Sequence, residues 1–262
     1  MLDPIWTKIR QDRLRALMET QHLDILYLSD ARDIYYATGQ LLNPPDPAAN
    51  FPAVFALAAD GSSWLVSHTM EGDALVTQRY AYEPAHAATM NPDPMTRLNE
   101  VVAAVVAGGH FPKRVAFQQE SLSWLLQDTI ARIQRPGAWI PIDTELQTMQ
   151  AIKDPDELQL MRGAIGCSAA AYAAARETIA PGVNELEVRE TGHRAAVLNA
   201  GEIVFHNGDY RSGVPGGFAR NRQIEAGELY IIDAWTCYRG YWSDLSRVFA
   251  VSEPTTLQQE VF

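Results

Sequence analysis

The spacing of apolar residues in the first half of the chain switches between helical and strand-like periods. The stretch IWTKIRQDRLRALMETQHL, residues 5–23, carries apolar side chains three to five positions apart and predicts an amphipathic helix, and DILYLS after it predicts a buried strand. A hairpin turning at Asp60-Gly61 is predicted within residues 53–67. The alternation continues with helices over 31–39, 94–109 and 121–133 and strands over 113–118 and 138–142. This order predicts an α/β domain large enough to bury its own core.

The pattern changes near residue 150, where a long helix is predicted. Asp154 as N-cap, Pro155 at the first helical position and Glu157 in the first turn are a start signal, and Pro181-Gly182 stops the helix after Ile179. Small residues recur on one face of this helix and would let another element approach closely: Ala164, Ser168, Ala171 and Ala175.

A second helix is predicted from Asn184 to Gly201, followed by a strand over 202–207, a glycine-rich loop over 208–221 and a hairpin over 231–249. We therefore expect two domains, residues 1–150 and 151–262, with the change of pattern at 143–153 and an α+β second domain.

Composition and charge exclude several classes of protein. Hydrophobic residues make up 47% of the 262 residues and charged residues 20%, which is typical of a globular chain. A net charge of −11 argues against a nucleic-acid or anionic membrane surface, and no apolar run is long enough to cross a bilayer. The N-terminus lacks the apolar core of a signal peptide. With only two cysteines, Cys167 and Cys237, a cytoplasmic protein with reduced thiols is expected.

Two carboxylates stand out in the final hairpin, IIDAWTCYRGYWSDLSRVF. If the turn centres between Tyr238 and Arg239, Asp233 lies directly opposite Asp244, and both side chains share one face of the sheet. Such a pair repels unless a cation lies between them, and divalent metals bind carboxylate oxygens. In the alternative interpretation, one acid pairs with Arg247 or Arg239.

The same hairpin resembles a family signature, Asp-x-Gly followed by Gly-Tyr-x-Ser-Asp-x-Thr-Arg-x-Phe, of the creatinase, aminopeptidase P and prolidase family, the pita-bread metallopeptidases. Matches in the family's order lie upstream, in ELQTMQAIKDPDELQLMRGA, IAPGVNELEV and RQIEAGELYIID, and RLRALMETQHLDILYLSDARDIYYATG is similar to the start of the family's N-terminal domain. The resemblance covers nearly the whole chain. It implies a creatinase-like α/β domain with a mixed sheet, followed by an incomplete α+β pita-bread domain.

The resemblance also implies chemistry. Asp233 and Asp244 would be the first two of five ligands to a dinuclear centre of manganese, cobalt or zinc, which hydrolyses an Xaa–Pro bond. The implied partners are a peptide or small-molecule substrate and a second copy of the chain in a homodimer, with no nucleic acid and no membrane. The other catalytic residues are unknown.

Three departures from the family pattern bear on function. The remaining family ligands, a histidine and two glutamates, have no counterpart in SEPTTLQQEVF, where Glu253 and Glu260 are unsuitable. The chain is therefore expected to be a truncated piece, inactive by itself, with an unpaired sheet edge. Gly216 stands where many family peptidases carry a substrate-contacting histidine, for which His206 is a candidate substitute, and Trp235 replaces the glycine of Asp-x-Gly.

These departures leave other functions open. Gly216 and Trp235 favour a creatinase-like or lyase-like relative that acts on a small metabolite, and the third possibility is a non-catalytic binding or dimerisation module. Neither cysteine is expected to be a nucleophile, because Cys167 lies on an alanine-rich helix and Cys237 has no histidine near it in sequence.

Overall fold

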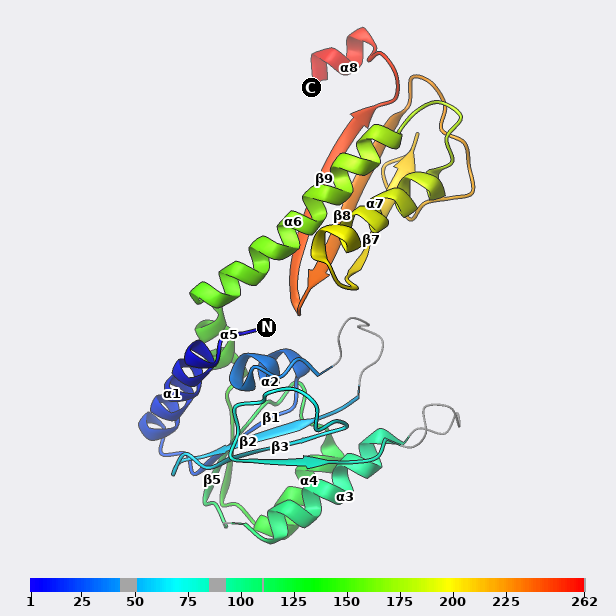
Figure 1. Cartoon of the computed structure of the whole chain (residues 1–262). Coiled ribbons are helices and arrows are strands. Elements are labelled where there is room, and N and C mark those ends of the chain that lie inside the picture. Colours follow the sequence, from blue (N-terminus) through cyan, green and yellow to red (C-terminus); the bar gives the residue numbers. More distant parts are fainter. Residues whose placement is uncertain (43–50, 85–92, 110, 262) are drawn as a thin grey trace. The chain divides into compact units, whose positions relative to one another are not determined.

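The computed structural model describes residues 1–42, 51–84, 93–109 and 111–261, which form two compact units, Met1–Asp156 and Glu157–Phe262 (Figure 1). The helices of the N-terminal unit are α1 (Pro4–Thr20), α2 (Ala31–Thr38), α3 (Pro94–Ala107), α4 (Trp124–Gln134) and α5 (Asp143–Ala151). Its strands are β1 (Ile25–Leu28), β2 (Val54–Ala58), β3 (Ser63–Ser67), β4 (Gln78–Ala81), β5 (Arg114–Phe117) and β6 (Ala138–Pro141).

These strands form one mixed sheet in the order β4-β3-β2-β1-β5-β6. β1 runs antiparallel to β2 and parallel to β5, so the sheet combines a hairpin with crossover connections through helices. A mixed sheet of this kind, with helices between its parallel strands, confirms the α/β class expected from the alternating pattern.

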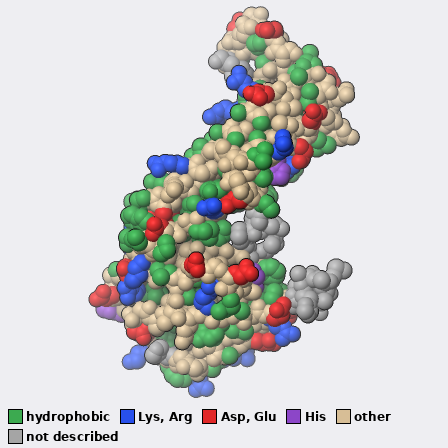
Figure 2. All heavy atoms as spheres, in the orientation of Figure 1, with side chains coloured by type: hydrophobic (Ala, Val, Ile, Leu, Met, Phe, Trp, Pro, Cys, Tyr) green, Lys and Arg blue, Asp and Glu red, His purple; other side chains and the backbone are tan. Residues whose placement is uncertain are grey.

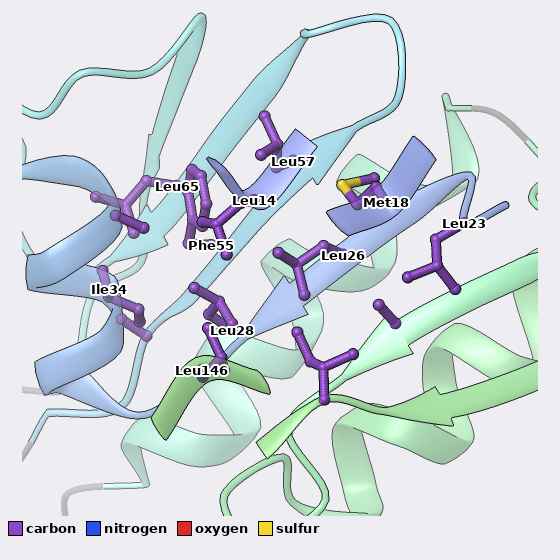
Figure 3. Close-up of a cluster of buried hydrophobic side chains, with 14 of the residues drawn as sticks. Leu14, Met18, Leu23, Leu26, Leu28, Ile34, Phe55, Leu57, Leu65 and Leu146 are labelled. Atoms are coloured by element: carbon purple, nitrogen blue, oxygen red, sulfur yellow. The ribbon is translucent and has the colours of Figure 1, made fainter. Parts of the chain in front are cut away.

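The sheet is buried on both faces because successive side chains of a strand point to opposite sides. Leu26 and Leu28 pack with residues of α1, α2 and α5, which include Leu14, Ile34 and Leu146 (Figure 3). Ile25 and Tyr27 of the same strand pack on the other side with residues of α3 and α4. All four residues of β1 are buried, which explains why the sequence of this strand is a continuous apolar run.

Local signals position these elements as expected. Gly39 ends α2 in the left-handed region, with φ of 74°, and its N–H donates to Tyr35 O at 2.8 Å. The β2–β3 hairpin turns at Asp60-Gly61, where Gly61 has φ of 88°. Both predictions are confirmed.

Two elements of this unit are absent from the predicted order. β4 is polar and half-exposed, so it has no hydrophobic alternation, and it is a strand because it pairs with β3. α5 buries only Leu146 in full and has no side-chain N-cap bond, so it lacks a helical signal of its own.

The C-terminal unit packs α6 (Pro155–Thr178) and α7 (Glu185–Ala200) on one face of an antiparallel sheet (Figure 1). The sheet consists of β7 (Phe205–Ser212), β8 (Leu229–Tyr238) and β9 (Tyr241–Ala250) in that order, and α8 (Thr256–Val261) follows. The small residues Ala164, Ser168, Ala171 and Ala175 are all completely buried, and Ser168 Oγ lies 2.7 Å from Thr236 Oγ1 of β8. The predicted close approach on this helix face is confirmed.

The prediction of a loop from residue 208 is wrong, because β7 continues to Ser212. Gly208 lies inside the strand, and a Cβ there would come within 2.3 Å of Asp233 O and 2.4 Å of Ala234 Cα. Glycine is needed here for the close approach of two strands, and the sequence alone made it look like the start of a loop.

Surface charge agrees with the acidic composition. On the face shown in Figure 2, Lys and Arg side chains are scattered among acidic and hydrophobic ones and form no continuous basic patch. In the described part of the chain, no helix has the length and apolarity that a membrane span requires.

Candidate metal centre on the C-terminal sheet

The turn between β8 and β9 decides which residues face each other. Arg239 and Gly240 both have positive φ, 49° and 84°, as a two-residue type I′ turn requires, and Tyr238 pairs with Tyr241. Asp244 therefore lies opposite Trp235, and Asp233 lies opposite Ser246. The expected direct pairing of Asp233 with Asp244 is wrong by two residues, because the turn uses Gly240 and not Tyr238.

The two acids still share a face of the sheet. Trp235 and Asp233 are two positions apart on β8, so Asp244, which faces Trp235, is a diagonal neighbour of Asp233. Diagonal neighbours on one face are about 7–8 Å apart at Cα, within reach of one shared cation. We call the side of the sheet away from α6 and α7 the open face; it carries Phe205, Asn207, Asp209, Arg211, Ile231, Asp233, Trp235, Cys237, Trp242, Asp244, Ser246 and Val248.

A third carboxylate, missed in the sequence, lies next to Asp233. Asp209 of β7 lies directly opposite Asp233 of β8. Burial raises the pKa of Asp233, and repulsion from Asp244 and from Asp209 raises it further. Alternation along β7 identifies Asp209 once the strand is known to extend past Gly208.

No basic side chain neutralises these acids in the described part of the chain. Arg239, one expected partner, pairs with Glu202 at 2.9 Å. Arg247, the other, donates to Ser246 O at 2.6 Å. The alternative interpretation, an ion pair within the hairpin, is therefore not what the structure shows.

The carboxylates of Asp233 and Asp244 have no cationic partner in the described part of the chain, and the pKa of Asp233 is raised. Their oxygens are the kind of ligand that a divalent metal ion binds. Within the described residues, however, no group of three or more His, Cys, Asp or Glu side chains is arranged to hold a metal ion. Asp233 and Asp244 thus supply part of a coordination sphere.

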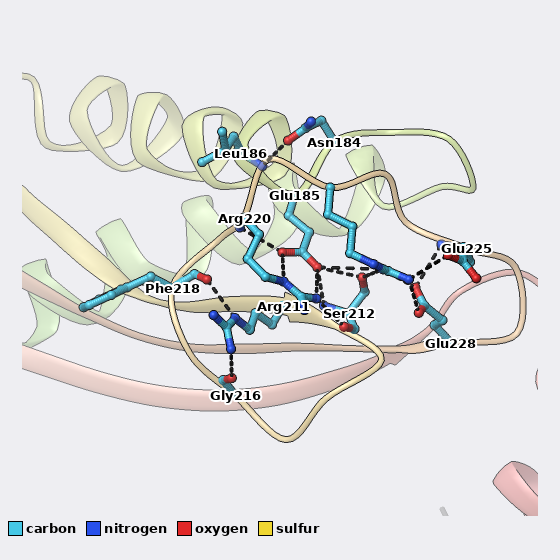
Figure 4. A network of polar contacts seen from close by, with 11 residues as sticks. Asn184, Glu185, Leu186, Arg211, Ser212, Gly216, Phe218, Arg220, Glu225 and Glu228 are labelled. Atoms are coloured by element: carbon cyan, nitrogen blue, oxygen red, sulfur yellow. Dashed lines mark hydrogen bonds and ion pairs between the residues drawn. The ribbon is translucent and has the colours of Figure 1, made fainter.

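The glycine-rich loop runs back along β7, where Tyr210 N donates to Gly217 O at 3.1 Å, and reaches Asp209. A Cβ on Gly216 would lie 2.5 Å from Asp209 Oδ2, so the loop comes into contact with this carboxylate. Arg211 holds the loop by donating to Gly216 O at 3.1 Å and Phe218 O at 2.9 Å (Figure 4). Gly216 lies beside Asp209, and a side chain there would collide with that carboxylate.

The base of this loop is fixed by a buried carboxylate. Glu185, at the start of α7, is fully buried and accepts from Ser212 N at 3.1 Å and from Arg220 Nη2 at 2.6 Å (Figure 4). Burial alone would raise its pKa, but the hydrogen bonds from Arg220 and Ser212 prevail and lower it to about 2.

An aromatic group occupies the turn end of the open face. Phe205 and Trp242 meet edge to face with centroids 5.7 Å apart. Trp235 lies between Asn207 and Asp244, on the side of the sheet that carries the acids. The large side chain at position 235 therefore borders the candidate metal centre.

His206 lies on the opposite face, under the helices. It is 2% exposed, with Nδ1 2.7 Å from Thr236 Oγ1 and Nε2 2.7 Å from Tyr210 Oη. Both ring nitrogens are used inside the core, so His206 does not substitute for a histidine at position 216.

Burial, and then the nearby positive charges of His193 and Arg189, lower the pKa of His206 to about 4. Because the unfolded chain takes up a proton near pH 6.5 and the folded chain does not, stability is greatest above that pH and falls as the pH drops toward 4.

We expect the free energy of unfolding to fall by about 2 kcal/mol more in wild type than in His206→Gln between pH 7.5 and pH 5. Urea denaturation at the two pH values checks this, with His22→Gln, at an exposed histidine of the N-terminal unit, as the control. Equal pH dependence of wild type and His206→Gln would contradict it.

The cysteines have the environments of unreactive thiols. Cys167 is 1% exposed, and burial raises the pKa of both Cys167 and Cys237. A raised pKa keeps the thiol protonated, as expected for residues without a nucleophilic role.

Both units, the α/β unit and the unit with helices packed on an antiparallel sheet, match a known family. Residues 10–152 match the family described as Creatinase/Prolidase N-terminal domain, and residues 159–262 match Metallopeptidase family M24. The chain belongs to the creatinase, aminopeptidase P and prolidase family, and its fold is a creatinase N-terminal domain followed by part of a pita-bread domain.

Relatives of known sequence match parts of the chain. An uncharacterized peptidase of Bacillus subtilis is 24% identical over 57% of this chain and 44% of its own length, and an Xaa-Pro dipeptidase of Pyrococcus horikoshii is 31% identical over 46% of this chain and 36% of its own. The matches thus span less than half the length of these two relatives.

Solved structures share the fold over more of the chain. An Xaa-Pro dipeptidase from Bacillus anthracis has a TM-score of 0.73 at 19% identity and is matched over 97% of this chain and 68% of its own. The prolidase from Pyrococcus horikoshii has a TM-score of 0.69 at 20% identity, with 96% and 67% matched.

Proposed function

We propose that this chain carries the N-terminal domain and part of the metal site of a metal-dependent hydrolase of the Xaa-Pro dipeptidase or aminopeptidase type. The observation that carries the proposal is the placement of Asp233 and Asp244 as diagonal neighbours on the open face, with no cationic partner in the described part of the chain. The names of two relatives, Xaa-Pro dipeptidase and Xaa-Pro aminopeptidase, support the substrate class.

In this proposal Asp233 and Asp244 are the metal ligands. Divalent ions bound there, manganese, cobalt or zinc, would supply the Lewis acidity that hydrolysis of an Xaa–Pro bond needs. The sheet holds the two carboxylates at a fixed spacing, and the loop with Gly216 borders the space beside them. Because the described residues bring no third ligand into place, we expect this chain by itself to bind metal weakly and to turn over no substrate.

We expect Co²⁺ to bind wild type with a dissociation constant of about 10⁻⁴–10⁻³ M, the weak end of carboxylate sites, and Asp244→Ala to weaken binding at least about ten-fold. Isothermal titration at low ionic strength measures both. Glu253→Gln, which removes an exposed acid outside the open face, is the control and should bind as wild type does. If Asp244→Ala and wild type bind Co²⁺ equally, the ligand assignment fails.

A second candidate function is that of a creatinase-like or lyase-like non-peptidase that acts on a small metabolite. Trp235 beside Asp244 and Gly216 against Asp209 favour it, because both reshape the surroundings of the acids. With Co²⁺ present, quenching of tryptophan fluorescence by a Gly-Pro dipeptide supports the peptidase, whereas a response to creatine alone supports the alternative. A response to neither favours a non-catalytic binding or dimerisation module.

Two further properties complete the proposal. We propose a homodimer, which sedimentation analysis tests, and a cytoplasmic protein, for which the free cysteines are the supporting observation.

A further inference from the structure

Tyr172 of α6 reaches the hairpin from the helix side, directly behind Asp233. Its side chain is 8% exposed and lies in the core formed by Ala171, Ala175 and Ile232. It belongs to none of the sequence motifs and contacts the backbone of the sheet, where the acids project on the other side.

The Tyr172 hydroxyl bonds both peptide groups that flank Asp233. It accepts from Ala234 N at 3.1 Å, and it lies 3.2 Å from Ile232 O, which shares the single hydroxyl proton with Leu245 O. The Ile232 carbonyl belongs to the peptide group before Asp233, and the Ala234 N–H belongs to the one after it. One hydroxyl thus fixes the backbone on each side of a proposed metal ligand.

The same hydroxyl also contacts the second strand. Tyr172 Oη bonds Leu245 O, and Leu245 is both the residue after Asp244 and the cross-strand partner of Ala234. The contact therefore joins the backbone positions next to both acids, which lie on different strands.

We propose that Tyr172 is a positioning residue for the metal site, which sets the placement of the Asp233 carboxylate relative to that of Asp244. This rests on the proposed function of the two acids as ligands. Side chains alternate along a strand, so a rotation of the two peptide groups around Asp233 turns its carboxylate directly. Two ligands on separate strands bind one cation well only if their spacing is held.

The Tyr172 hydroxyl also stays in the protonation state that this positioning role requires. Burial raises the pKa of Tyr172 to about 12, with the charges of Asp233 and Asp244 adding to the effect, so the group stays a neutral donor and acceptor. A phenylalanine would fill the same core volume and would lose all three backbone contacts.

Tyr210→Phe is a matched control. Tyr210 is a fully buried tyrosine of the same core, and its hydroxyl bonds His206 Nε2 and no backbone group of β8. Both variants remove a buried hydroxyl that takes part in hydrogen bonding, so both should lose stability, Tyr172→Phe by more because its hydroxyl has three contacts and that of Tyr210 has one.

The test compares Co²⁺ affinity and amide exchange in wild type, Tyr172→Phe and Tyr210→Phe. We expect Tyr172→Phe to bind Co²⁺ about ten-fold more weakly than wild type and Tyr210→Phe within about two-fold of it. In the metal-free chain, hydrogen exchange of the peptide covering residues 231–236 should rise in Tyr172→Phe and stay as in wild type in Tyr210→Phe.

The outcomes distinguish a failure of the positioning role of Tyr172 from a failure of the proposed metal-binding function. If wild type binds Co²⁺ and Tyr172→Phe binds it equally well, Tyr172 has only a structural role and the inference is overturned. If wild type and Asp244→Ala bind Co²⁺ alike, the metal assignment fails, and the positioning role fails with it.

Discussion

Replacing Arg10 by alanine is expected to lower the free energy of unfolding of the N-terminal unit by about 3–5 kcal/mol. Arg10 is fully buried, and its guanidinium bonds Asp154 Oδ2 at 3.0 Å and also Asp156 Oδ1. Both acids are less than a tenth exposed. Without Arg10, carboxylates remain in the interior with much of their compensating charge gone.

The remaining contacts show why the loss is large. Asp154 keeps Arg13, at 2.8 Å, and Asp156 still accepts from the Asp3 N–H, at 3.0 Å, but neither contact replaces the fully buried guanidinium that bonds both carboxylates. The Arg10 guanidinium also lies over the Tyr36 ring, 5.2 Å from its centroid. The arginine therefore ties α1 to Asp154 and to the first turn of α6.

Arg13→Ala is the control, since Arg13 is 39% exposed and binds the same Asp154. This ion pair is half-exposed, because Asp154 is only 7% exposed, but Asp154 keeps its bond to Arg10 when Arg13 is removed. The variant should therefore lose no more than about 2 kcal/mol, clearly less than Arg10→Ala. Urea unfolding followed by hydrogen exchange of α1 and β1 reports on the N-terminal unit. A loss for Arg10→Ala no larger than that for Arg13→Ala would show that the buried charges are not compensated by Arg10.

Much of the N-terminal fold could be predicted because its signals are local. β1 is a short apolar run, α2 ends at a glycine with positive φ, and the β2–β3 turn contains Asp60-Gly61. β4 and α5 could not be predicted in this way, because their sequences carry neither period and tertiary pairing alone makes them regular.

The candidate site was predicted in part, and its errors have one physical origin. Register in a hairpin depends on which two residues adopt positive φ, and placing the turn one residue too early moves every pairing by two positions. A shift of two positions leaves Asp233 and Asp244 on the same face of the sheet, because side chains repeat every second residue. It changes their cross-strand partners, so Trp235 was missed as the partner of Asp244 and Ser246 as the partner of Asp233.

Asp209 was missed for a different reason. Gly208 resembles a loop residue, and only the 2.3 Å approach that a Cβ would make to Asp233 O shows why a strand needs glycine there. Close backbone approach depends on a partner strand far away in the sequence, which no local pattern encodes. The buried Tyr172 contact is hidden for the same reason.

Replacing Glu185 by glutamine is expected to lower the free energy of unfolding of the C-terminal unit by about 3 kcal/mol at pH 7. The variant keeps the size of the side chain but removes the charge that binds Arg220 and the Ser212 N–H and hydroxyl. Glu187→Gln is the control, because Glu187 lies in the same first turn of α7 and is exposed. Its effect should be below about 1 kcal/mol, the size of an exposed helix-dipole interaction.

The effect of Glu185 depends on pH in a defined window. Its pKa is lowered to about 2 in the folded chain, whereas an ordinary glutamate titrates near 4.5. The stabilisation is therefore complete above about pH 4.5 and is lost as the pH falls toward 2, because only then is the folded carboxylate protonated as well. Urea unfolding of wild type and Glu185→Gln at pH 7 and pH 3 should show the difference between them shrink by more than half. A difference that stays constant over this range would mean that packing, and not the charge of Glu185, fixes the loop that carries Gly216 to Asp209.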